Sequence, residues 1–107
     1  MLEKRIEQRL GRLLHRRGAL FYKFVSPGRP GVPDRIAVLP GGRVVFIELK
    51  TDTGRVSKLQ NYEMGKLALQ GAEVYVVREG SLHSFVETLF AGYESQPGIY
   101  REGMLDD

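Results

Sequence analysis

The segment that most constrains the fold of this chain is residues 44–50, Val-Val-Phe-Ile-Glu-Leu-Lys. Its first four residues are all apolar, so a strand formed by them is apolar on both faces, as is usual in the interior of a sheet. The preceding Pro40-Gly41-Gly42 is typical of a hairpin turn. We therefore expect residues 35–39 and 43–50 to form two paired strands, with the second in the centre of its sheet.

Helices are predicted on both sides of this hairpin in the sequence. Residues 2–17 carry leucines and an isoleucine at helical spacing, with basic residues on the opposite side. Ser57 and Gln60 match a capping box that opens a second helix, which ends near Gly71. Ser81 is expected to cap a third helix, because the apolar residues that follow it repeat at i, i+3, i+4 and i+7.

The remaining segments complete an α/β pattern. Residues 20–25 and 73–78 are short, apolar and β-rich, and are predicted to be strands. The eight residues 26–33 contain three prolines and two glycines, which indicates a loop. The order α-β-β-β-α-β-α predicts an α/β sandwich, in which helices flank a central mixed β-sheet.

Composition limits the classes of protein to consider. With 107 residues, 42% of them hydrophobic and 27% charged, the chain has the size of one globular domain. We assign residues 1–92 to that domain and 93–107 to a polar C-terminal tail. The absence of cysteine excludes disulfides and thiolate metal sites. Without an apolar run of ~20 residues or a secretory signal, we expect an intracellular, cytoplasmic protein of a bacterial or phage-infected cell, with no membrane contact.

Basic residues are concentrated in the first third of the chain. Residues 1–35 hold nine Lys or Arg and three acidic residues, whereas the other residues hold seven and ten. A basic surface attracts polyanions at long range, so this asymmetry suggests nucleic acid as a partner. The alternative is an arginine-rich helix face that is merely solvated, and charge alone does not choose between the two.

Three charged residues are expected to gather at one end of the hairpin. Alternation along a strand sends Glu48 and Lys50 to the same face. Asp34 precedes the neighbouring strand, and the start of one hairpin strand lies opposite the end of the other. Asp34 should therefore lie near Glu48. An E-x-K tripeptide is common by chance, so the alternative is an ordinary ion pair at a strand end, with Asp34 in a turn.

Two adjacent carboxylates would suit a hard divalent cation. Oxygen ligands such as those of Asp34 and Glu48 are preferred by Mg²⁺, and the backbone carbonyl of Leu49 is a candidate third ligand. Such a cation can bind a phosphate oxygen and orient water, while Lys50 offers positive charge to the transition state. Residues arranged in this way could act on a phosphate ester, and spacing alone does not choose between this role and the ion pair. The sequence contains neither a Gly-rich phosphate loop nor a serine nucleophile elbow, and we expect no organic cofactor.

Several motifs occur together in the order found in a known nuclease family. They are the runs Lys23-Phe24-Val25-Ser26-Pro27-Gly28-Arg29-Pro30-Gly31-Val32-Pro33-Asp34-Arg35, Gly41-Gly42-Arg43-Val44-Val45-Phe46-Ile47-Glu48-Leu49-Lys50 and Ser57-Lys58-Leu59-Gln60. With them the chain resembles the VRR-NUC family of the PD-(D/E)XK superfamily. The resemblance extends from the first helix to the strand at residues 73–78.

The resemblance implies a restriction-endonuclease-like fold and Mg²⁺- or Mn²⁺-dependent hydrolysis of DNA. It makes Asp34 and Glu48 metal ligands and Lys50 the catalytic lysine. The family's helix glutamate, a metal ligand, matches Glu7, and its glutamine matches Gln60. Helical geometry does not distinguish Glu7 from Glu3, one turn earlier, and a solvated acid is the alternative for each. For Gln60 the alternative is capping alone.

The leading hypothesis is a metal-dependent endonuclease of structured or branched DNA. Because short members of the resembled family act as homodimers, symmetrical cutting of a four-way (Holliday) junction is implied. The other hypothesis is a DNA-binding module without catalysis, recruited to a replication or recombination complex. Candidate phosphate-contacting residues in either case lie beside the proline loop and on the first helix: Lys23, Arg29, Arg9, Arg12 and Arg16.

Overall fold

A computed structural model describes residues 2–92, and their order of elements is the predicted one. The helices are α1 (Leu2–Arg16), α2 (Lys58–Leu69) and α3 (Leu82–Phe90). The strands are β1 (Leu20–Lys23), β2 (Arg35–Val38), β3 (Val44–Lys50) and β4 (Glu73–Arg78). A short 3-10 turn, η1 (Glu79–Ser81), joins β4 to α3. The tail assigned to residues 93–107 lies outside the described residues.

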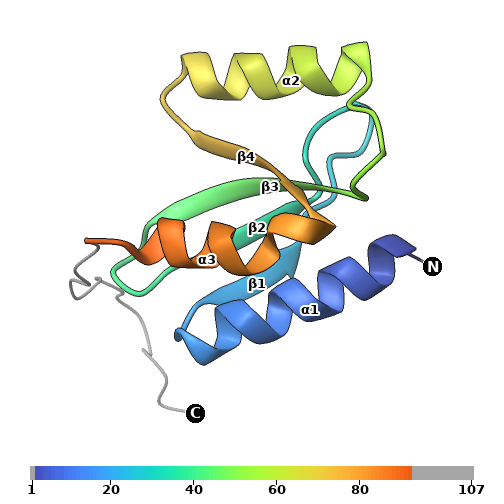
Figure 1. Cartoon of the computed structure of the whole chain (residues 1–107). Coiled ribbons are helices and arrows are strands. Elements are labelled where there is room, and N and C mark those ends of the chain that lie inside the picture. The colour runs from blue at the N-terminus through green and yellow to red at the C-terminus, as the bar shows by residue number, and fades with distance from the viewer. Residues whose placement is uncertain (1, 93–107) are drawn as a thin grey trace.

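The four strands form one mixed sheet in the order β1-β2-β3-β4. Strand β2 is antiparallel to both β1 and β3, and β4 runs parallel to β3. Strand β3 therefore has a partner on each side, which confirms the interior position predicted from its apolar sequence. The helix α2 makes the crossover from β3 to β4 that a parallel pair requires (Figure 1).

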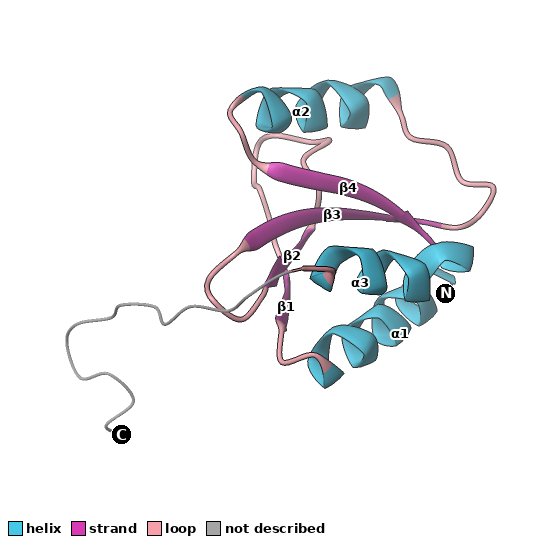
Figure 2. Cartoon of the chain, turned by 60° about the vertical axis from the view of Figure 1, so that its left-hand side comes forward, coloured by secondary structure: helices cyan, strands magenta, loops and turns pink. Residues whose placement is uncertain are grey.

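The helices divide between the two faces of the sheet. Figures 1 and 2 show α1 and α3 side by side on one face and α2 on the other. The hydrophobic core fills the first of these interfaces, where alternate residues of β3 meet α1 and α3. Its members include Ile6, Leu10, Leu14, Ala37, Val45, Ile47, Leu49, Val77, Leu82, Val86 and Leu89. The intervening residues of β3, which include Glu48 and Lys50, consequently face the side of α2.

The proline loop packs against the start of α2. Strand β1 ends at Lys23 instead of continuing to Val25 as predicted, and the loop is closed by a hydrogen bond from Phe24 N to Asp34 O of 2.8 Å. A Cβ atom on Gly31 would lie 2.8 Å from the Leu59 side chain, and the φ of Gly31 is 91°. Glycine is required there, because both the space and the backbone conformation exclude a side chain.

The two predicted helix caps have different outcomes. Ser57 forms the predicted capping box with Gln60. The prediction that Ser81 caps α3 is wrong, since its side chain makes no capping hydrogen bond and its backbone is not extended. The 3-10 turn begins the helix earlier, and Asp52 Oδ1 accepts the Gly80 amide at 2.8 Å, so another side chain takes over a donor of this turn.

None of the helices in residues 2–92 combines the length and apolar character needed to cross a membrane.

Candidate active site

The antiparallel pairing of β2 and β3 brings the two predicted carboxylates together. Arg35 pairs with Ile47, so Asp34 and Glu48 occupy the next position outward. Glu48 is buried, with 8% of its surface exposed, whereas the Asp34 side chain is 54% exposed. The site therefore has one inner carboxylate fixed in the sheet and one outer carboxylate open to solvent.

The surroundings of Glu48 raise its pKa above the ordinary value. Burial is the largest cause, and the negative charge of Asp34 is the next. Lys50 opposes this effect, Glu3 adds to it, and Arg35 opposes it. The position thus disfavours a negative charge on Glu48 as long as no further cation is near.

Lys50 lies on the same face of β3 as Glu48, as strand alternation predicted. Its Nζ atom is 3.9 Å from Glu48 Oε2, and both side chains are largely buried. Leu49, between them, turns its side chain into the core. In the sequence Glu-Leu-Lys, the two charged residues therefore face the side of α2, and the apolar residue packs in the core on the other face.

Gln60 is both a cap and a partner of the buried carboxylate. The backbone N–H of Ser57 donates to Gln60 Oε1 at 3.0 Å, and the backbone N–H of Gln60 donates to Ser57 Oγ at 3.0 Å. Its Nε2 donates to Glu48 Oε2 at 3.2 Å. The sequence left open that Gln60 both caps the helix and reaches the site, and the two contacts occur together because the first turn of α2 faces the end of β3.

Arg35 links the site to α1 and had no role in the predictions from sequence. Its NH2 pairs with Glu7, and its NH1 lies 2.9 Å from Asp34 Oδ1. Its Nε is buried with no hydrogen-bond partner among the described residues. A signal was present in the sequence: strand alternation puts Arg35 on the same inward face as Ala37, where an arginine needs acidic partners.

The two candidate acids of α1 have different surroundings. Glu7 is bound to Arg35, so it reaches Asp34 only through that guanidinium. Glu3 is one turn nearer the N-terminus and is among the charges that raise the pKa of Glu48.

The predicted DNA-contacting residues do not form one cluster. Lys23 and Arg29 line a groove of about 270 Å³ beside Asp34, although Arg29 also lies 3.4 Å from the buried Glu63. Arg9 on α1 is 3.6 Å from Glu79. Arg12 and Arg16 are exposed further along that helix.

Comparisons with known proteins agree with this geometry. A comparison with protein-family models found no match. A curated protein of Acyrthosiphon pisum secondary endosymbiont phage 1, named "Putative nuclease p44", is 38% identical over 84 residues, which are 78% of this chain and 90% of that protein. A solved structure described as a VRR_NUC domain superimposes with a TM-score of 0.72 over 86% of this chain and 97% of that one, at 28% identity.

The chain belongs to the VRR-NUC family. The family resemblance expected from the motifs and the α/β fold expected from the sequence are both confirmed.

The residues of this VRR-NUC site fit a divalent cation. Asp34 and Glu48 provide oxygen ligands, and the raised pKa of Glu48 shows that its charge lacks full compensation from Lys50. Within the described part of the chain, no three or more acidic or histidine side chains are grouped to hold a metal ion. The remaining ligands would have to be backbone carbonyl, water or substrate oxygens, which suits a cation that keeps open positions.

Proposed function

We propose that this chain is a metal-dependent DNA endonuclease with Asp34, Glu48 and Lys50 at its centre. The observation that carries the proposal is the convergence of two carboxylates, one of them buried with a raised pKa, beside a largely buried lysine. The nuclease name of the phage relative and the VRR_NUC neighbour support the same reaction class.

Asp34, Glu48 and the backbone carbonyl of Leu49 would hold Mg²⁺ or Mn²⁺. A cation bound there would supply Lewis-acid stabilisation of the charge that develops on the phosphate during hydrolysis. Glu48 provides the fixed ligand because the sheet and Gln60 hold it in place. Asp34, which is more exposed, provides the ligand that can adjust.

Lys50 places its amine beside the position proposed for the reacting phosphate. Its Nζ atom is 3.9 Å from Glu48 Oε2. The Lys50 side chain is largely buried, which limits the positions that the amine can adopt. A preorganised cation of this kind stabilises a phosphorane-like transition state without reorganising solvent. Gln60 is a positioning residue in this proposal, since it acts by orienting Glu48.

The helix α1 contributes an acid to the proposed site, with Glu7 and Glu3 as candidates. We retain Glu7, the residue matched by the family motif, as the candidate metal ligand from α1, and its carboxylate is paired with Arg35. Glu3 acts on Glu48 directly by its charge. Metal titration of Glu3→Gln and Glu7→Gln separates them, because the ligand's variant binds the cation more weakly.

The DNA would pass over Lys23 and Arg29 at the groove beside Asp34, with Arg9, Arg12 and Arg16 as further phosphate contacts along α1. Structured or branched DNA is the proposed substrate, and symmetrical cutting of a four-way junction by a homodimer is the proposed specific form. Light scattering tests the dimer, and a monomer at working concentrations would contradict it.

The proposed reaction is tested by cleavage of labelled four-way-junction, flap, duplex and single-stranded DNA with Mg²⁺ or Mn²⁺ and with EDTA. Lys50→Ala should abolish cutting, whereas Lys66→Ala, a matched change on α2, should leave it intact. Symmetrical nicks in the junction would select the resolvase. If the protein binds these DNAs and cuts none of them with either metal, it is a DNA-binding module without catalysis.

A further inference from the structure

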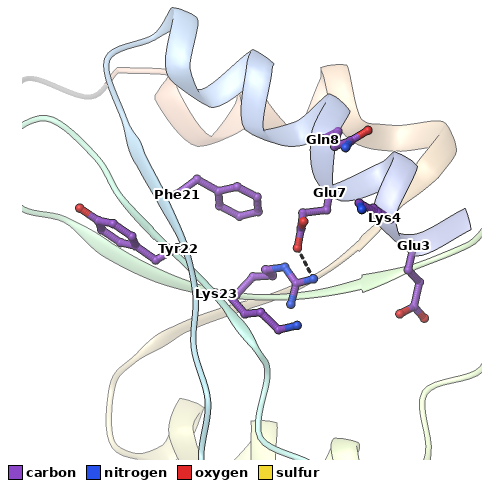
Figure 3. A pocket seen from close by; sticks show the side chains of 8 residues that line it. Glu3, Lys4, Glu7, Gln8, Phe21, Tyr22 and Lys23 are labelled. Carbon is purple, nitrogen blue, oxygen red and sulfur yellow. Dashed lines mark ion pairs between the residues drawn. The ribbon is translucent and has the colours of Figure 1, made fainter. Parts of the chain in front are cut away.

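A second polar cavity lies next to the proposed catalytic carboxylates, on the other face of the sheet. It has a volume of about 590 Å³ and is bounded by the first turns of α1 and by β1. Figure 3 shows Glu7 extending from α1 toward the sheet and the Phe21 ring extending toward α1. The residues that matter here are Lys4, Glu7 and Gln8 from the helix and Phe21, Lys23 and Arg35 from the sheet.

The cavity is connected to the catalytic site by one side chain. Arg35 forms part of its wall and pairs with Glu7, while the same guanidinium lies 2.9 Å from Asp34 Oδ1. Lys23 is the direct pairing partner of Arg35 across β1 and β2, and it also lines the groove that contains Asp34. Lys23 therefore borders both the groove that contains Asp34 and this cavity.

The chemistry of the lining favours a nucleobase over a phosphate in its interior. The cavity is lined by two carboxylates, Glu3 and Glu7, which disfavour a phosphate, and carboxylate oxygens can accept hydrogen bonds from the exocyclic amine of a base. The amide of Gln8 can donate and accept along a base edge, and the Phe21 ring offers a flat surface for stacking. Lys4 and Lys23 carry the charges that suit flanking phosphates.

We propose that this cavity binds one unpaired nucleotide of the DNA strand at the site, with its base directed toward Phe21 and Gln8. This inference rests on the proposed action on DNA, and it adds the feature of the substrate that is recognised. The volume lies within the roughly 300–1,000 Å³ usual for ligand pockets. A base can enter only where it is not held in a pair, so DNA with an unpaired nucleotide beside the cut is preferred over perfect duplex.

The test compares two DNAs that differ only in whether one 2-aminopurine is paired or unpaired. Binding is measured in EDTA, so that no strand is cut and the repulsion from Asp34 and Glu48 affects both DNAs equally. The wild-type protein should bind the unpaired probe about 5-fold more tightly or better, with a change in its fluorescence on stacking. Gln8→Ala and Phe21→Leu should each reduce this preference about 3-fold or more.

The matched control is Arg12→Ala, an exposed position further along α1 that does not line the cavity. It should weaken binding of both DNAs to the same extent and leave the preference unchanged. Equal affinity of the wild-type protein for the two DNAs, or an undiminished preference in both cavity variants, would overturn the inference. A protein that shows the preference and cuts nothing would overturn the proposed catalysis only, and one that cuts without any preference would overturn the cavity assignment only.

Discussion

The two ends of the β2–β3 pair use charged residues in opposite ways. At the turn end, Arg43 donates to both carboxylate oxygens of Glu73, at 2.7 and 2.6 Å, and to Leu89 O at 2.7 Å. This raises the pKa of Arg43 and lowers that of Glu73. At the other end, burial and the charge of Asp34 raise the pKa of Glu48.

One end of this strand pair therefore serves the stability of the fold, and the other end serves the proposed function. At the turn end, the Arg43 guanidinium lies between β4 and the end of α3, and its hydrogen bonds hold these two elements together. The Asp34 end gathers negative charge that Lys50 only partly offsets, which is unfavourable for folding alone and useful for holding a cation. Variants at the two ends should therefore have opposite effects on stability and activity.

The largest expected effect is on catalysis at the Asp34 end. Glu48→Gln should reduce the rate of DNA cleavage on the order of 10²–10³-fold, because it removes the fixed charged ligand. The free energy of unfolding should stay the same or increase, since the buried charge is lost. Glu73→Gln is the control: it should lower the free energy of unfolding and leave the rate of DNA cleavage unchanged. Full cleavage activity in Glu48→Gln would remove this residue from the mechanism.

Metal binding should offset the uncompensated negative charge at the Asp34 end and so stabilise the fold. At a concentration about 100 times its Kd, Mg²⁺ or Mn²⁺ should raise the free energy of unfolding of the wild-type protein by about 2.7 kcal/mol. The gain should disappear in Asp34→Asn and persist in Glu73→Gln. Urea unfolding with metal and with EDTA measures it, and an equal gain in all three proteins would show that the cation binds elsewhere.

Breaking the turn end should cost stability. Arg43→Leu should lower the free energy of unfolding by roughly 2 kcal/mol, because Glu73 and the carbonyl of Leu89 lose a charged donor. Cleavage well below the melting temperature should be unchanged. Arg12→Leu provides a matched change at an exposed position and should have little effect on stability. A cleavage defect in folded Arg43→Leu would show that the two ends are coupled.

The smallest expected effect is a difference in pH dependence. The pKa of Glu73 is lowered from 4.5, so its contribution to stability is complete above pH 4.5 and is lost as pH falls through the lower, folded-state value. The pKa of Glu48 is raised from 4.5, so its unfavourable contribution is relieved as pH falls from the folded-state value toward 4.5. Unfolding curves of Glu73→Gln should show a weaker acid loss, and those of Glu48→Gln should lack the relief. Identical pH profiles of the two variants would contradict the opposite shifts.

The fold was predictable because its elements follow simple periodicities. Alternation placed Glu48 and Lys50 on one face, and hairpin geometry placed Asp34 beside them before any relative was considered. The capping box at Ser57 was equally local, since its two partners are three residues apart. The prediction at Ser81 failed because a 3-10 turn precedes α3, and the Gly80 amide of this turn donates to Asp52, which is far away in sequence.

Long-range contacts of charged side chains were not predictable in the same way. The pairing of Arg35 with Glu7, and of Arg9 with Glu79, joins residues whose separation follows no periodicity. The arginine-rich side of α1 looked uniform in sequence, and both Arg9 and Arg12 are exposed, yet Arg9 lies 3.6 Å from the acidic Glu79. Such differences depend on how the layers stack.

The hydrogen bond from Gln60 to Glu48 has a consequence for local motion. Helix ends usually fray first, and this would release the amide of Gln60 from Ser57. Here the same residue holds a buried carboxylate, so opening the first turn of α2 also disconnects Glu48. The backbone amide proton of Gln60 should therefore exchange with solvent unusually slowly for a helix terminus. Its exchange rate should report on whether Glu48, which lies on β3, is still held in place.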